Sequence, residues 1–269
     1  MADTLRHPGP PAEPRLMLSP TRAEWRRITL PADMPMDRAI AQALAGADSA
    51  WISFQDAQGD LRFVWPERAS DGLHAAWYST PRALTGARIA RAGIVWGLRD
   101  GQGFGHCHGC WGDTMGHLLL DASVLARPVQ AEAWIFRDAR FKAGDDAETA
   151  FTLFKPHGGC DGMAQAALLR LAPHVELVPA LMTALTRLGW DSAQAMGLGS
   201  LNVARFSDGT VLDSHATEFL IRPGRISVSA PSVAVDIVGI GGVRAAGVLA
   251  ETGNRICVTA ELILIDQRE

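Results

Sequence analysis

The sequence predicts an α+β protein that is built as two repeated halves. Three observations lead to this fold class. Short strand-like segments separated by turns run along most of the chain, only two segments carry a helical pattern, and short motifs of the first half return in the second. With 269 residues, of which 48% are hydrophobic and 20% charged, the chain can bury one large core or two smaller ones.

The first half is expected to begin near Leu16, because residues 1–15 contain four prolines and little apolar sequence and predict a flexible tail. A strand from Trp25 to Leu30 leads to a helix from about Pro35 to Ala45, which Gly46 ends. Further strands share apolar or alternating patterns bounded by turn residues and are predicted at 50–54, 61–65, 87–98, 103–111 and 124–136.

Residues 137–176 lose this periodicity, and the glycine-rich segment 155–162 is typical of an exposed loop. We therefore predict a linker over 155–176 between two domains, 16–154 and 177–269. The second domain is predicted to start with a helix over about 178–188. Its strands are richer in β-branched residues and are expected at 193–206, 210–212, 217–221, 226–229, 233–240 and 255–265.

The two halves share short motifs at corresponding places. Ala43-Leu44 followed by Asp48-Ser49-Ala50 is repeated as Ala184-Leu185 followed by Asp191-Ser192-Ala193. Near the other end, the segment 129–132 (Val-Gln-Ala-Glu) is repeated as 258–261 (Val-Thr-Ala-Glu). These echoes indicate a diverged tandem repeat.

Three histidines within a dozen residues form the most informative motif of the chain. Alternate side chains of a strand share a face, so His106 and His108 point the same way while Cys107 points to the other side. The polar, glycine-rich stretch 109–116 can turn the chain back and bring His117 beside them. Three imidazoles leave one tetrahedral position open, which suits a catalytic metal better than a structural one.

Cys107 and Cys110 also form a C-x-x-C motif, which suggests a redox pair or, together with the histidines, a closed structural zinc site. No second C-x-x-C completes a four-sulfur site, and Trp111 stands where a c-type haem motif needs histidine. We expect Cys107 to pack on the far face of its strand.

These residues resemble the plants and prokaryotes conserved (PPC) domain, whose hallmark is a His-x-His-Gly strand, a Gly-His-Leu segment and a final strand with a glutamate. Here those elements are His106-Cys107-His108-Gly109, Gly116-His117-Leu118 and Glu132. The second half is similar to the same domain without its histidines. The resemblance implies two PPC-like domains, each a mostly antiparallel sheet with few helices, assembled as a homo-oligomer, commonly a trimer.

The resemblance also has implications for chemistry. A fold relative, α-acetolactate decarboxylase, holds zinc with a similarly spaced set of histidines. Glu132 matches the family glutamate and is our candidate for general acid/base work. Plant members that bind DNA use an Arg-Gly-Arg-Pro core for much of that contact, and this chain lacks it. In the second half Glu218 or His215 is a candidate to face the metal, and His157 and Cys160 are candidates for a lid, although a surface role is the simpler expectation for each.

Composition limits the remaining choices. A formal net charge of -4 and a pI near 6.1 argue against a nucleic-acid-binding surface. The N-terminus has no leader-like pattern, no apolar run is long enough to cross a bilayer, and the four cysteines do not form a disulfide framework, so a cytoplasmic protein without a membrane partner is expected.

The sequence thus predicts a zinc enzyme that acts on a small oxygenated carboxylic acid as a lyase, decarboxylase or hydrolase, with the metal on His106, His108 and His117. Iron, manganese or nickel would accept the same ligands. The alternatives are a regulatory or DNA-associated PPC-domain protein with a structural metal site, and an assembly scaffold with a vestigial site.

Overall fold

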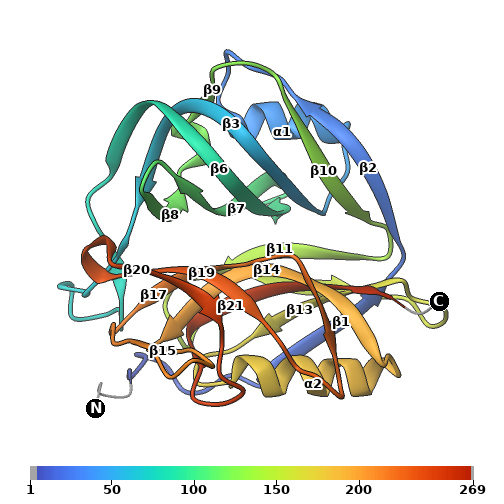
Figure 1. Cartoon of the computed structure of the whole chain (residues 1–269). Coiled ribbons are helices and arrows are strands. Elements are labelled where there is room, and N and C mark those ends of the chain that lie inside the picture. Colours follow the sequence, from blue (N-terminus) through green and yellow to red (C-terminus); the bar gives the residue numbers. More distant parts are fainter. Residues whose placement is uncertain (1–4, 268–269) are drawn as a thin grey trace.

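The computed structural model describes residues 5–267, in which two mostly antiparallel sheets lie face to face (Figure 1). The first sheet consists of β2 (Ala23–Leu30), β3 (Ala50–Val64), β6 (Arg82–Arg99), β7 (Gln102–Trp111), β8 (Thr114–Leu118), β9 (Val124–Leu125), β10 (Val129–Phe136), β11 (Ala139–Asp145) and β12 (Thr152–Gly158). The second consists of β1 (Leu16–Thr21), β13 (Ala166–Leu171), β14 (Ser192–Asn202), β17 (Thr217–Ile221), β18 (Gly224–Ser227), β19 (Ala234–Gly239), β20 (Arg244–Val248) and β21 (Arg255–Asp266).

Two short strand pairs and two single-turn 3-10 helices complete the described part. The pairs are β4 (Pro66–Glu67) with β5 (Trp77–Tyr78), and β15 (Ala204–Arg205) with β16 (Val211–Leu212); the turns are η1 (Leu120–Ala122) and η2 (Ile240–Gly242).

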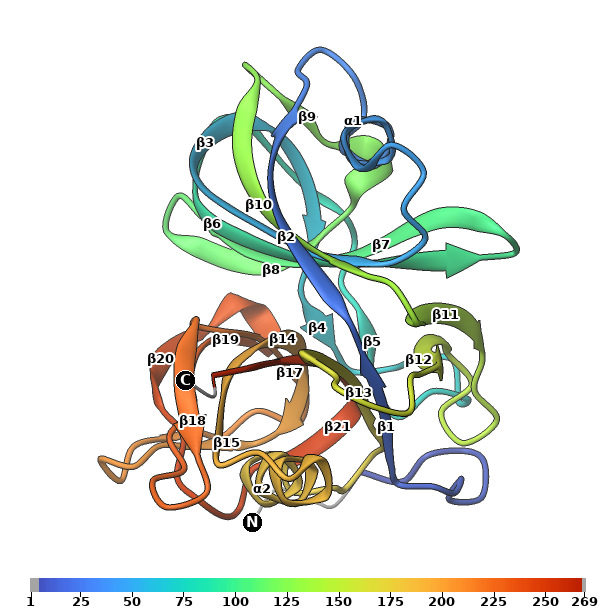
Figure 2. The ribbon, with the colours of Figure 1, turned by 90° about the vertical axis from the view of Figure 1, so that its right-hand side faces the viewer.

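Each sheet carries one α-helix on its outer face (Figures 1 and 2), and both helices were predicted. Helix α1 (Met36–Leu44) buries Met36, Ile40 and Leu44, which share one side of the helix because they are spaced four residues apart. Helix α2 (Leu177–Leu188) ends at Gly189, which takes a left-handed φ of 65° that glycine adopts without strain. No helix in the described residues is long and apolar enough to span a membrane.

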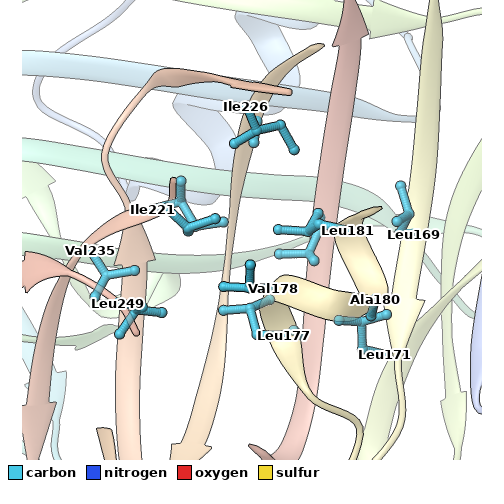
Figure 3. Close-up of a cluster of buried hydrophobic side chains, with 14 of the residues drawn as sticks. Leu169, Leu171, Leu177, Val178, Ala180, Leu181, Ile221, Ile226, Val235 and Leu249 are labelled. Carbon is cyan, nitrogen blue, oxygen red and sulfur yellow. The ribbon is translucent and has the colours of Figure 1, made fainter. Parts of the chain in front are cut away.

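The apolar interior forms three layers. One cluster lies between α1 and the first sheet, a second lies between the two sheets, and a third lies between α2 and the second sheet (Figure 3). Close approach of the sheets requires Gly93 on β6, because a Cβ atom there would lie 2.6 Å from both Leu220 and Trp51. Strands at the centre of the molecule are therefore buried on both faces.

This double burial explains why the sequence pattern did not predict β13. Strand β13 lies inside the segment 155–176, which was expected to be a linker, and all six of its residues are buried. Its sequence, Ala-Ala-Leu-Leu-Arg-Leu, shows no alternation because neither face meets solvent. Strands β11, β12 and β20 were also not predicted, whereas the two strands expected at 50–54 and 61–65 form the single strand β3 with a register shift between Gly59 and Leu61.

The N-terminal segment, expected to be a flexible tail, is fixed over residues 5–15. Leu5 is buried, His7 Nε2 lies 2.8 Å from the carbonyl oxygen of Cys257, and Arg15 donates to both carboxylate oxygens of Glu148 at 2.6 and 2.9 Å. Residues 1–4 of the expected tail lie outside the described part of the chain. Strand β1 then pairs with β13 of the second sheet, so the chain starts in that sheet before it crosses to the first.

The two sheets repeat the same succession of strand pairings. In the first sheet it runs β2-β10-β3-β6-β7-β8, and in the second β13-β21-β14-β17-β19-β20. In the first sheet α1 connects β2 to β3, and in the second sheet α2 connects β13 to β14, so the helix has the same place in both.

We expect Leu181→Ala to lower the free energy of unfolding by about 2–5 kcal/mol, because Leu181 is fully buried between α2 and the second sheet. Urea unfolding followed by circular dichroism measures the change. The control is Arg187→Ala on the exposed side of the same helix, for which about 0.5 kcal/mol or less is expected. Equal losses in both variants would contradict the arrangement of α2.

Candidate metal centre

The structure brings the three histidines of the predicted site together. His106 and His108 lie on β7, and His117 on β8 stands opposite His108 in the antiparallel register. One ligand nitrogen from each ring can be chosen so that all three lie within 4.8 Å of one another. Cys107, as predicted, faces the opposite way, into the apolar cluster beneath α1.

The Nδ1 atoms of His106 and His108 already have hydrogen-bond partners. His108 Nδ1 lies 2.8 Å from the carbonyl oxygen of Phe219, which can only accept, so Nδ1 carries the proton and Nε2 is a bare lone pair. His106 Nδ1 lies 2.9 Å from Glu261 Oε2. The two Nε2 atoms of His106 and His108 point toward each other at 3.1 Å.

Two lone pairs at this distance repel unless a proton or a cation lies between them. When Glu261 is ionised it accepts the His106 Nδ1 proton, both Nε2 atoms are bare, and the pair fits a metal whose bonds to histidine nitrogen are about 2.0–2.1 Å long. A carboxylate or carbonyl behind a ligating imidazole is the usual arrangement in metal sites. The donor set therefore fits a metal ion.

Burial keeps His106 and His108 neutral, as metal ligands must be. Desolvation lowers the pKa of His108 to about 3, against the opposing effect of the Glu218 carboxylate. Desolvation also holds the pKa of His106 well below its ordinary value, with a further contribution from His117. Neutral imidazole nitrogens are available at physiological pH without displacing a proton from the ring.

Two glutamates of the second sheet complete the site. Glu218 on β17 places Oε1 3.6 Å from His117 Nδ1 and 3.8 Å from His108 Nε2, and its Oε2 is buried without a hydrogen-bond partner in the described chain. Glu261 on β21 is 1% exposed, and burial raises its pKa to about 7, although Thr259 and Arg170 favour the ionised form. Gly197, with φ of 142°, lies against the Glu261 carbonyl, where a Cβ atom would come within 2.4 Å.

Glu132, the acid/base candidate from the sequence, does not join the histidines. It is exposed on β10, opposite Arg27 and Ser53, and lines a different cavity. The glutamate at the corresponding place of the second Ala-Glu motif, Glu261, reaches His106 instead. The repeat of the Ala-Glu motif in the second half was the sequence signal that could have identified Glu261.

The other candidates take different places. His215 and His157 do not line the histidine cavity, and His157 is exposed on β12. Cys107 and Cys110 lie in different apolar clusters, on opposite faces of β7, so they do not form a redox pair. The metal-competent group found in the described residues contains no cysteine.

The histidines open into a cavity of about 280 Å³ between the two sheets. Its wall is mainly apolar and aromatic, and it includes Trp77, Tyr78, Phe104, Phe151 and Phe154. Among residues 5–267, no arginine or lysine lines it. Burial, with the Glu218 and Glu261 carboxylates, raises the pKa of Tyr78 well above its ordinary value, so this phenol keeps its proton; its ring lies 5.1 Å from that of His117.

Comparison with known proteins finds only weak similarities. No family model matches the chain, and no match is found among curated proteins. Among solved structures, a metal-containing protein from Archaeoglobus fulgidus is 18% identical, with 52% of this chain and 97% of that chain covered and a TM-score of 0.38. A PPC protein from Pyrococcus horikoshii is 14% identical, with 52% and 94% covered and a TM-score of 0.37.

A third neighbour is a provisionally named DNA-binding protein from Bacteroides thetaiotaomicron. It is 18% identical, with 40% of this chain and 83% of that chain covered and a TM-score of 0.35. The neighbours thus include a protein of the family that the sequence resembles. Because each TM-score is below 0.5, we rest the function on side chains of this protein alone.

Metal content tests the centre directly. Protein purified without chelators is expected to contain about one transition-metal ion per chain, and His108→Ala to lose most of it, because a ligand and its fixed orientation are removed together. Elemental analysis gives the ratio and circular dichroism checks the fold. His157→Ala, an exposed histidine outside the cavity, is the matched control. Negligible metal in the unaltered protein would exclude the site.

Metal binding is also expected to release about one proton per ion below pH 7 and fewer above it. The raised pKa of Glu261 means that the metal-free protein holds an extra proton on the Glu261–His106 pair in this range, and that proton can fill the gap between the two Nε2 atoms. Calorimetric titration in buffers of different ionisation enthalpy counts the protons. A release that is the same at pH 6 and pH 8.5 would contradict this account.

Proposed function

We propose that the protein is a metal-dependent enzyme, most simply a zinc hydrolase, whose site lies between the two sheets. His106, His108 and His117 would hold the ion, and iron, manganese or nickel would accept the same donors. Such an ion, when bound by neutral imidazoles, acidifies a water molecule and polarises a substrate carbonyl. The observation that carries the proposal is the Glu218 carboxylate, whose Oε1 lies beside the histidine nitrogens and whose Oε2 has no hydrogen-bond partner, in a cavity that no arginine or lysine of the described residues lines.

Glu218 is the proton carrier in this proposal. Its carboxylate is 4% exposed and faces the open side of the histidine cluster, where it can take a proton from attacking water and return it to a leaving group. Glu261 has a different task, because it contacts the outer nitrogen of His106 and fixes the orientation of that ring. Tyr78 stays protonated and can donate to an oxygen that gains charge.

The cavity wall favours one of the three reaction types that the sequence predicted. Decarboxylation and lyase chemistry on a carboxylic acid need a cation for the substrate carboxylate in addition to the metal that polarises the reacting oxygen, and neither arginine nor lysine of the described residues lines this cavity. Two buried glutamates would also repel an anionic group. An uncharged ester, lactone or amide with a small apolar or aromatic body fits the wall better than a free carboxylic acid does.

We expect Glu218→Gln to lower kcat for an aryl ester or aryl lactone by about 10²–10⁴-fold, because the base is replaced by a group that cannot accept a proton, while the metal is retained. Steady-state assays with elemental analysis on the same sample separate the two readouts. Glu251→Gln, an exposed glutamate remote from the cavity lining, is the control. Loss of metal in Glu218→Gln would instead make Glu218 a ligand, and turnover of keto or hydroxy acids alone would favour the lyase.

A second candidate is a regulatory or DNA-associated protein with a structural metal site. Two neighbours, from Bacteroides thetaiotaomicron and Ralstonia eutropha, are provisionally named DNA-binding proteins, and those names suit this candidate better than an enzyme. Under this candidate, duplex affinity measured by fluorescence anisotropy should fall steeply as salt rises. A net charge of -4 leads us to expect no duplex binding even at low salt.

We also propose that the two halves are diverged copies, each PPC-like. The shared succession of strand pairings and the repeated Ala-Glu motif support this. The limits of the two domains, an oligomer such as a trimer, and a cytoplasmic location stay predictions from the sequence.

A further inference from the structure

A second cavity, of about 400 Å³, shares no lining residue with the histidine cavity. Strands β2, β3, β6 and β10 of the first sheet form most of its wall, and the end of β17 with Pro223 forms the rest. Its polar side chains include Arg27, Arg91, Glu132, Gln55 and Gln130. Unlike the histidine cavity, it therefore presents guanidinium groups.

Two buried donors in this wall have no acceptor in the described part of the chain. Trp51 is 2% exposed and its Nε1 has no hydrogen-bond partner, and the Nε of Arg91 is likewise buried and unpartnered. A buried donor that stays unsatisfied destabilises the fold by about 1–3 kcal/mol, and native proteins rarely keep one without a reason. A bound molecule with an acceptor atom could satisfy both donors.

The charges around these donors favour an anionic acceptor. Arg91 forms an ion pair with Asp236, and Arg222 contacts the same carboxylate at 2.7 and 3.2 Å, so two guanidinium groups share one buried anion. Arg27 adds a second guanidinium group to the cavity wall beside Arg91, and the exposed Glu132 opposite Arg27 adds one negative charge. The surplus is one positive charge, with Glu132 able to accept from a hydroxyl or ammonium group.

Strand registers relate this cavity to the histidine site. Ser53 pairs with Glu132 and with Gly93, while Leu198 pairs with Glu261 and with Leu220, so Glu132 corresponds to Glu261. Arg91 lies two residues before Gly93, and Glu218 lies two residues before Leu220. Arg91 therefore corresponds to Glu218.

The same registers give the neighbours of Gly93 and Leu220 on the other side, each within its own sheet. Gly93 pairs with His108 and Leu220 with Asp236. The contact between Arg91 and Asp236 is therefore the counterpart of the contact between Glu218 and His108. The second cavity lies at the place that corresponds to the metal centre, with the Arg91 guanidinium in the position of the Glu218 carboxylate and the Asp236 carboxylate in the position of the neutral His108 imidazole.

From these observations we propose that the second cavity is a binding site for a small organic acid that carries a hydroxyl or amino group. Its carboxylate accepts from Arg91, Arg27 and the Trp51 indole, and its second polar group donates to Glu132. The site is independent of the metal centre and of the reaction proposed for it.

Nuclear magnetic resonance of the indole N–H groups tests the proposal. The chain has eight tryptophans, and Trp51→Phe identifies the Trp51 signal by its disappearance. Titration with sodium glycolate is expected to move this signal in a saturable way, whereas glycolamide, its uncharged analogue, and sodium chloride at equal ionic strength are not. An equal shift with chloride would show an unspecific ion effect and would overturn the proposal.

Variants locate the binding. Arg91→Gln is expected to weaken glycolate binding about tenfold or more, the effect of one lost charge-assisted hydrogen bond. Arg88→Gln, an exposed arginine three residues earlier on the same strand, should bind as the unaltered protein does. If Arg91→Gln fails to fold, the exposed Arg27→Gln serves in its place and is expected to weaken binding severalfold. Unchanged affinity in Arg27→Gln, or an unmoved Trp51 signal, would contradict the site.

Discussion

The approach of the His106 and His108 Nε2 atoms to 3.1 Å is the interaction on which the candidate site depends. Neither ring can turn away, because Phe219 holds one by its backbone and Glu261 holds the other by its carboxylate. Both of these partners belong to the second sheet. The first sheet therefore supplies the donors, while the second fixes their direction, and the site exists only where the two sheets meet.

The layered fold packs the two sheets against each other. Each helix covers the outer face of its own sheet, and the inner faces bury a common apolar cluster (Figure 1). A charged group in that middle layer must be paired or neutral, since an isolated buried charge is costly. The neutral histidines, the raised pKa of Glu261 and the shared carboxylate of Asp236 are three responses to the same constraint.

The sequence predicted what depends on local pattern. Alternation along one strand placed His106 and His108 on one face and Cys107 on the other, and apolar spacing placed both helices. It did not predict β13, because a strand buried on both faces shows no alternation of polar and apolar residues, and its one charged residue, Arg170, is itself buried. It also favoured Glu132 over Glu261, because which copy of the motif faces the histidines is decided by contact between the sheets and not by neighbours in the chain.

The side chains at the two places that correspond by strand register differ, and this difference explains why only the first offers a set of donors for a metal. A metal ion needs several uncharged or anionic donors that are free to turn toward it, and the first cavity offers three imidazoles and a carboxylate with an unpartnered oxygen. At the second place, Asp236 stands where His108 stands in the first and is already occupied by Arg91 and Arg222. A cation entering there would meet guanidinium groups, whereas an anion would meet donors without partners. The buried pair of His108 and Glu218 at the first place and of Asp236 and Arg91 at the second thus gives the two cavities different electrostatic character.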